Sequence, residues 1–124
     1  MNAVLKFYNL ETWKLARVLR NDIAKLVKNF PDTEKFRLID QIIRSSRSVT
    51  ANIAEGFGRF HYQESAHFYR QARGSLTETV DHLICAFDQQ YISKVTLQQF
   101  LDRFEECGRL LNGLIRSQST HAKK

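Results

Sequence analysis

Turn-forming residues and cysteines are scarce in this 124-residue sequence, which holds one proline, five glycines and two cysteines. With so few turn signals, we expect a few long elements and an all-α fold, because many short strands would need more turns. Two cysteines are too few for a disulfide framework, and no secretory leader is evident, so we expect a cytoplasmic protein. Apolar runs are much shorter than the roughly 20 residues that cross a bilayer, so we expect no membrane span.

The composition is that of an ordinary globular domain with a basic excess. Hydrophobic residues make up 43% and charged residues 26% of the sequence, which predicts a single domain over residues 1–124. The formal net charge is +6, and it is unevenly distributed. Residues 1–30 carry six basic and two acidic side chains, whereas residues 61–90 carry two basic and four acidic ones. An anionic partner is therefore expected to bind near the amino terminus.

Apolar residues recur at intervals of three and four along four segments, as in helices that bury one face. The predicted helices cover approximately residues 10–28, 34–55, 61–88 and 96–117. Pro31 separates the first two, and Gly56 and Gly58 are expected to end the second with a left-handed backbone. Residues 118–124 have no apolar anchor and are expected to be disordered. Short connections between long helices predict an up-down-up-down antiparallel four-helix bundle.

A stripe of polar side chains runs beside the apolar stripe of the second predicted helix. Counting outward from the turn at residues 56–59 places Ser45 and Ser46 opposite Gly74 and Ser75. Small residues facing small residues predict a close contact, with polar groups bonded across the gap or to backbone carbonyls. The residues that we assign to this structural polar seam are Ser48, Asn52, Glu55, Ser75 and Glu78. A ligand site at the same place is the alternative.

Basic residues form a row on one face of the first predicted helix and continue along the second. The candidate nucleic-acid-binding residues are Lys14, Arg17, Arg20, Lys25, Lys28, Arg44 and Arg47. Such a row can follow phosphates and bind RNA or DNA by shape and charge, without reading the base sequence. The alternative is that these side chains form only the solvated face of a helix.

Four segments together resemble a known bacterial family. They are Phe7–Trp13, Phe30–Pro31, Ser48–Arg59 and Ala72–Glu78. Their combination is similar to the four-helix bundle family that includes the ribosomal-RNA intervening-sequence proteins. The resemblance implies association into a ring, typically a homopentamer. A second branch, the accessory variability determinant proteins, implies a reverse transcriptase partner and a basic surface for nucleic acid; this sequence resembles the intervening-sequence branch more closely, and that branch has no settled activity.

Residues for enzyme chemistry are sparse. Glu64 and His67 match the Glu-x-x-His element of di-iron bundles, but such a site needs a second copy of the element, and Arg109 stands where its histidine would be. No nucleophile motif or glycine-rich phosphate loop is present, so we expect no enzyme activity, no cofactor and no metal. Three functions stay open: a nucleic-acid-binding oligomeric accessory protein, which we favour, a protein-binding scaffold or accessory subunit with no nucleic-acid role, and a metalloenzyme.

Overall fold

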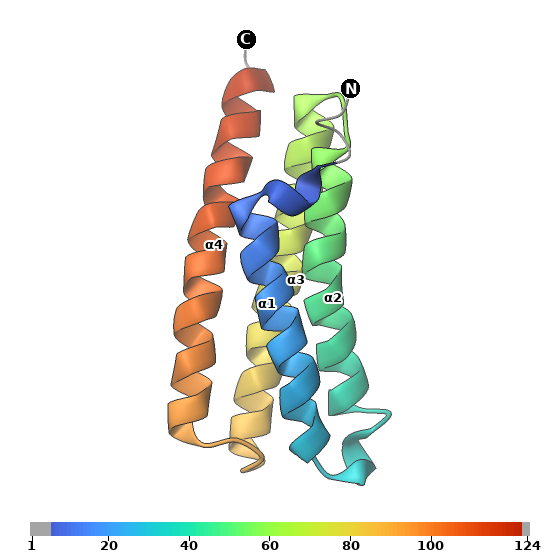
Figure 1. The fold of residues 1–124 in the computed structure, drawn as a ribbon, viewed down its shortest axis with the longest axis vertical. Coiled ribbons are helices and arrows are strands. Elements are labelled where there is room, and N and C mark those ends of the chain that lie inside the picture. The colour runs from blue at the N-terminus through green and yellow to red at the C-terminus, as the bar shows by residue number, and fades with distance from the viewer. Residues whose placement is uncertain (1–5, 123–124) are drawn as a thin grey trace.

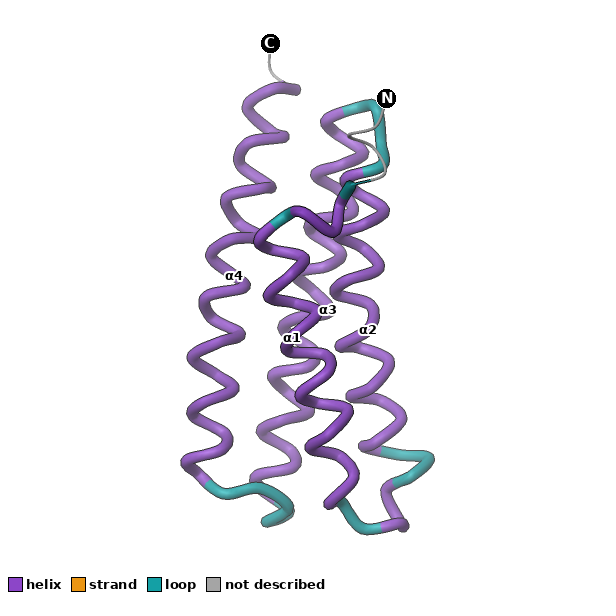
Figure 2. The backbone as a smooth tube through the Cα atoms, viewed as in Figure 1, coloured by secondary structure: helices purple, strands orange, loops and turns teal. Residues whose placement is uncertain are grey.

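The computed structural model describes residues 6–122, which form four long α-helices and contain no strand (Figure 1). The helices are α1 (Glu11–Leu26), α2 (Leu38–Phe57), α3 (Tyr62–Asp88) and α4 (Lys94–Ala122). Short connections join consecutive helices, which run in opposite directions (Figure 2). Helix α1 packs against α2 on one side and α4 on the other, and α3 packs against α2 and α4. The predicted all-α, up-down-up-down four-helix bundle is confirmed.

Two of the predicted helix ends were wrong by four or five residues, and the other ends differ from the structure by at most two. A 3-10 turn at Asp32–Glu34 precedes α2, which begins at Leu38 because Arg37 has a non-helical backbone with φ −123° and ψ −106°. Helix α4 continues to Ala122, so residues 118–122 of the segment that we expected to be disordered are helical. No proline or glycine follows Gly113 to stop this helix. Residues 123 and 124 lie outside the described residues.

The turn between α2 and α3 also differs from the prediction. None of the described glycines has a positive φ, and Gly58 ends α2 with φ −81° and ψ −2°. Gly56 instead lies inside α2, buried against the ring of Tyr69 on α3. A Cβ atom added at Gly56 would lie 2.7 Å from Tyr69 Cε1, so glycine is needed there for close approach and not for a left-handed conformation.

All four helices contribute to one apolar core. Its largest fully buried side chains include Leu19, Ile23, Ile42, Ile53, Leu83, Cys107 and Leu111. Each fully buried aliphatic side chain contributes about 1.5–3 kcal/mol relative to its exposed state. At the end opposite the α2–α3 turn, the Tyr91 hydroxyl donates to Glu34 Oε2 over 2.8 Å, and the Tyr91 ring contacts that of Phe30. These contacts tie the α3–α4 connection to the α1–α2 connection.

Candidate nucleic-acid interface

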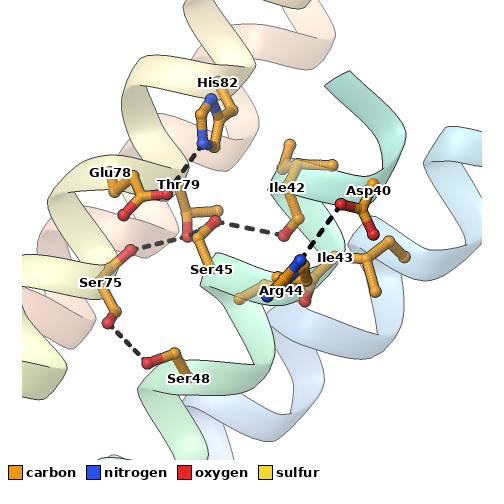
Figure 3. Close-up of polar contacts among 11 residues, drawn as sticks. Asp40, Ile42, Ile43, Arg44, Ser45, Ser48, Ser75, Glu78, Thr79 and His82 are labelled. Atoms are coloured by element: carbon orange, nitrogen blue, oxygen red, sulfur yellow. Dashed lines mark hydrogen bonds and ion pairs between the residues drawn. The ribbon is translucent and has the colours of Figure 1, made fainter. Parts of the chain in front are cut away.

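Hydroxyl groups meet between α2 and α3, but in a different register from the one predicted (Figure 3). Ser75 Oγ lies 2.8 Å from Ser48 Oγ, and Thr79 Oγ1 lies 2.8 Å from Ser45 Oγ. We had placed Gly74 in this contact, but Gly74 is exposed and no atom lies within 4 Å of a Cβ built on it. Counting residues from the turn located the contact along the bundle, but it could not show which side of α3 faces α2.

The structure separates the residues assigned to the polar seam. Ser48 and Ser75 face each other, and Asn52 Nδ2 donates to the Ser48 carbonyl over 2.9 Å. The two carboxylates lie outside the seam: Glu55 pairs with Arg59 and Glu78 with His82, each over 3.1 Å. Both glutamates are exposed because their helical positions lie beyond the edge of the contact.

Thr79 is the seam residue that the sequence reasoning missed, although its place four residues after Ser75 was a usable signal. It is fully buried, and its hydroxyl also lies 2.8 Å from the Ser75 carbonyl. Similarly, Ser45 Oγ lies 3.3 Å from the Ile42 carbonyl. Among the described residues, every buried side-chain nitrogen or oxygen has a hydrogen-bond partner. The internal bonding of the seam favours a structural role over a ligand site.

The seven basic candidates differ in whether an acidic group already neutralises them. Lys14 Nζ lies 3.5 Å from Glu11 Oε1, and Arg44 Nη1 lies 3.6 Å from Asp40 Oδ2. The other five form no ion pair with any residue in the described range: Arg17, Arg20, Lys25, Lys28 and Arg47. Their charge is therefore available for an anionic partner.

Arg20 and Arg47 line a groove of about 570 Å³ between α1 and α2. The aromatic rings of Phe7 and Trp13 lie along it, and small side chains from both helices leave the space open. These small lining residues are Ala24, Ser46, Thr50, Ala51 and Ala54. The row of basic residues on α1 thus lies beside a concave surface with aromatic and cationic walls.

The side chains around Trp13 are held in a defined arrangement. Arg20 Nη1 donates to Thr50 Oγ1 over 2.8 Å, and the buried Thr50 hydroxyl lies 3.0 Å from the Arg47 carbonyl. The guanidinium carbons of Arg17 and Arg20 lie 5.7 Å and 5.9 Å from the centroid of the Trp13 ring, within cation–π range. We call the groove, together with Arg17 beside it, the arginine groove.

Trp13, Phe7 and Thr50 were not among the sequence-predicted site residues. The spacing of Trp13, Arg17 and Arg20 was a usable signal, since positions i, i+4 and i+7 share one face of a helix. The contribution of α2 had no local signal, because Thr50 lies 30 residues from Arg20 and meets it only in the folded bundle.

The two halves of the bundle also differ in charge. Residues 6–59, which contain α1 and α2, hold eleven lysines and arginines and six acidic residues. Residues 61–122, which contain α3 and α4, hold six basic and seven acidic residues. The positive charge is therefore concentrated in the half that forms the arginine groove, which favours association of an anionic ligand with that side.

Other reactive side chains are dispersed. The exposed Glu64 carboxylate lies 3.6 Å from Arg59, and the His67 ring nitrogen lies 3.3 Å from Gln71 Nε2. In the described part of the chain, no group of three or more His, Cys, Asp or Glu residues is placed to hold a metal ion. None of the described helices is both long and apolar enough to span a bilayer.

We predict that iodoacetamide will modify Cys85 and spare Cys107 in the folded protein. Cys107 is fully buried, and burial raises the pKa of its thiol to about 12. Cys85 is exposed, but desolvation and the nearby Glu34 carboxylate raise its pKa, so its alkylation should still be rising above pH 9. Peptide mass spectrometry measures both sites, and equal modification of the two before unfolding would contradict the structure.

The fold and the groove define a small helical-bundle protein with a basic, partly aromatic surface. The chain belongs to the 23S rRNA-intervening sequence protein family, whose family model matches residues 8–113. This confirms the family resemblance seen in the sequence.

A solved structure shares the fold: a protein of unknown function from the S23 ribosomal protein family of Bacteroides thetaiotaomicron. The two chains are 23% identical and superpose with a TM-score of 0.78, covering 85% of this chain and 95% of the other. At that identity the likeness shows the fold alone. No functionally curated protein matches the chain.

Proposed function

We propose that this protein is a non-enzymatic accessory protein that binds RNA or DNA, without sequence preference, through the surface formed by α1 and α2. The observation that carries the proposal is that Arg20 and Arg47 line the groove and Arg17 lies beside the Trp13 ring, and none of the three forms an ion pair with a described residue. Lys25, near the end of α1, and Lys28, in the 3-10 turn that follows, are exposed and add positive charge to the same half of the bundle.

Phosphate recognition follows from the chemistry of these groups. An arginine guanidinium can donate two parallel hydrogen bonds to a phosphate. When basic side chains contact the phosphates of a nucleic acid, the counterions condensed on it are released into solution. The bond from Arg20 to Thr50 fixes one guanidinium before a ligand arrives, which lowers the entropy lost on binding. Phosphate contacts carry no base information, so the expected binding is independent of sequence.

Assembly into a ring, as in the homopentamer implied by the family resemblance, would strengthen this binding. Repeating the α1–α2 surface around a symmetry axis adds the potentials of all copies at the same nucleic acid. Native mass measurement determines the number of subunits.

The second candidate function is a scaffold that binds another protein, such as a reverse transcriptase. Phe36 and Phe60, near opposite ends of α2, are 85% and 80% exposed. Exposed aromatic side chains of this kind are enriched at protein interfaces. This candidate predicts a partner protein and no affinity for nucleic acid.

Reversing three charges on α1 tests the favoured function. The Lys14→Glu/Arg17→Glu/Lys25→Glu variant should bind labelled RNA and DNA more weakly. Its slope of log affinity against log salt should be smaller by about two, one each for Arg17 and Lys25, because Lys14 is already paired with Glu11. Fluorescence anisotropy between about 50 and 200 mM salt measures both quantities, a range over which phosphate contacts dominate the change in affinity.

A matched control changes the net charge by the same amount, but on the opposite half of the bundle. Lys94→Glu/Arg109→Glu/Arg116→Glu alters three exposed basic residues of α4 and should leave most of the affinity and the slope intact. Equal losses in the two variants would show that net charge alone drives binding. No binding by the unaltered protein would favour the scaffold function.

A further inference from the structure

We propose that the arginine groove binds unpaired nucleotides, with a base stacked against Trp13 and the backbone phosphates held by Arg20 and Arg47, so that the protein prefers single-stranded RNA or DNA to a duplex. This inference rests on the proposed nucleic-acid function and specifies the form of nucleic acid that the groove accepts.

The shape of the groove favours a single strand. Its volume of about 570 Å³ lies within the range of roughly 300–1,000 Å³ that is usual for pockets holding small organic ligands. The bases of a duplex are stacked inside a rigid convex cylinder, so they cannot enter a hollow between two helices. A flexible single strand can turn its bases outward and insert them.

The chemistry of the walls matches an unpaired nucleotide. Trp13 provides a half-buried indole ring, and the Phe7 ring contacts it edge-on with a centroid separation of 5.3 Å. Bases stack on aromatic rings and on guanidinium planes, and Arg17 and Arg20 place guanidinium groups beside this ring. A base at Trp13 would thus meet both an aromatic and a cationic surface.

Hydrogen-bond donors that can bind phosphate lie on both sides of the groove. Arg20 extends from α1 and is held by Thr50, while Arg47 comes from α2 and is exposed. Alanine side chains in the lining, Ala24 and Ala51 among them, can contact a sugar or the edge of a base without burying an unpaired polar group. Phosphates on either side of a stacked base would therefore meet opposite walls.

Trp13 is the only tryptophan in the chain, so its fluorescence reports directly on the groove. The full-length protein is titrated with 12-nucleotide oligo(U) and oligo(dT) and with a 12-base-pair duplex. A fourth probe is an abasic oligomer that carries the same number of phosphates as the single strands. We expect the single strands to quench the fluorescence and to bind about tenfold more tightly than the duplex and the abasic oligomer. Either sugar supports the proposal, and the comparison of the two single strands shows which one is preferred.

Two substitutions test the walls separately by anisotropy with a labelled single strand. Arg47→Gln should weaken single-strand binding about tenfold, as expected for loss of a charged hydrogen bond, while the matched exposed variant Arg109→Gln should leave it within about twofold. Trp13→Leu should remove the preference over the abasic oligomer, whereas Trp13→Phe should keep it. Circular dichroism checks that each variant folds. If Trp13→Leu does not fold, the comparison of Arg47→Gln with Arg109→Gln decides the test.

Failures of the two proposals are distinguishable. Equal affinity for single strand, duplex and abasic oligomer would overturn the groove proposal, and nucleic-acid binding would stand if the α1 charge reversals still weakened all three. Unchanged Trp13 fluorescence at saturation would overturn it as well. Absence of binding to every probe at about 50 mM salt would overturn the nucleic-acid function itself, since phosphate contacts are strongest at low salt.

Discussion

Replacing Gly56 with alanine should lower the free energy of unfolding by about 1–3 kcal/mol, the usual cost of overpacking a well-packed core. The added Cβ would lie 2.7 Å and 2.9 Å from the Tyr69 ring and 3.0 Å from the Ser65 carbonyl oxygen. Tyr69 is 3% exposed, so the ring cannot move aside without displacing α3. This clash outweighs the roughly 0.5–1 kcal/mol that alanine contributes over glycine inside a helix.

Gly74→Ala is the matched control, because Gly74 is also helical but exposed, with no atom within 4 Å of an added Cβ. It should stabilise the protein by about 0.5–1 kcal/mol. Urea denaturation of both variants measures the difference. If both substitutions stabilise the protein, α2 and α3 do not approach each other closely at Gly56.

Replacing Thr79 with leucine should destabilise the bundle by about 1–3 kcal/mol. Thr79 is fully buried, and its hydroxyl contacts Ser45 across the α2–α3 seam. A larger side chain there must separate the two helices or adopt a strained rotamer. Thermal or urea unfolding monitored by circular dichroism measures the change.

Thr77→Leu provides the control for this substitution. Thr77 lies on the same helix, and its hydroxyl bonds to a carbonyl four residues earlier, as that of Thr79 does, but Thr77 is exposed. The change in stability should stay within about 0.5 kcal/mol. Thr79→Val keeps the shape of the side chain and removes the hydroxyl. A decrease of about 1 kcal/mol in its free energy of unfolding would be the contribution of the hydrogen bonds that Thr79 makes. Equal effects of leucine at positions 77 and 79 would contradict the close seam.

Helix α2 connects the structural and the proposed functional surfaces. One side contributes Ser45 and Ser48 to the seam with α3, and a neighbouring side contributes Arg47 and Thr50 to the groove with α1. Because the seam limits how α2 can rotate, it also limits where Arg47 and Thr50 lie relative to Arg20. A substitution that separates α2 from α3 at the seam should therefore lower the stability of the bundle and also displace Arg47 and Thr50 relative to Arg20.

The sequence by itself determined the helical architecture. Recurrence of apolar residues every three or four positions reflects burial of one face of each helix, which is a local property, so four helices and their antiparallel order were predictable. Helix ends were less predictable: Arg37 interrupts the start of α2 by its backbone conformation, and α4 continues to Ala122 without an apolar anchor. The basic row on α1 was equally visible, because its members share one helical face.

Only the tertiary structure decided which polar residues meet. Rotation of each helix about its axis placed Thr79 in the seam and left Gly74 and Glu78 on the surface. The same packing brought Arg47 and Thr50 to the face of α1 that carries Trp13. Helical periodicity defines which residues share a face, but the fit of side chains between helices determines which faces touch. The arginine groove exists because small residues of α1 and α2 face each other there.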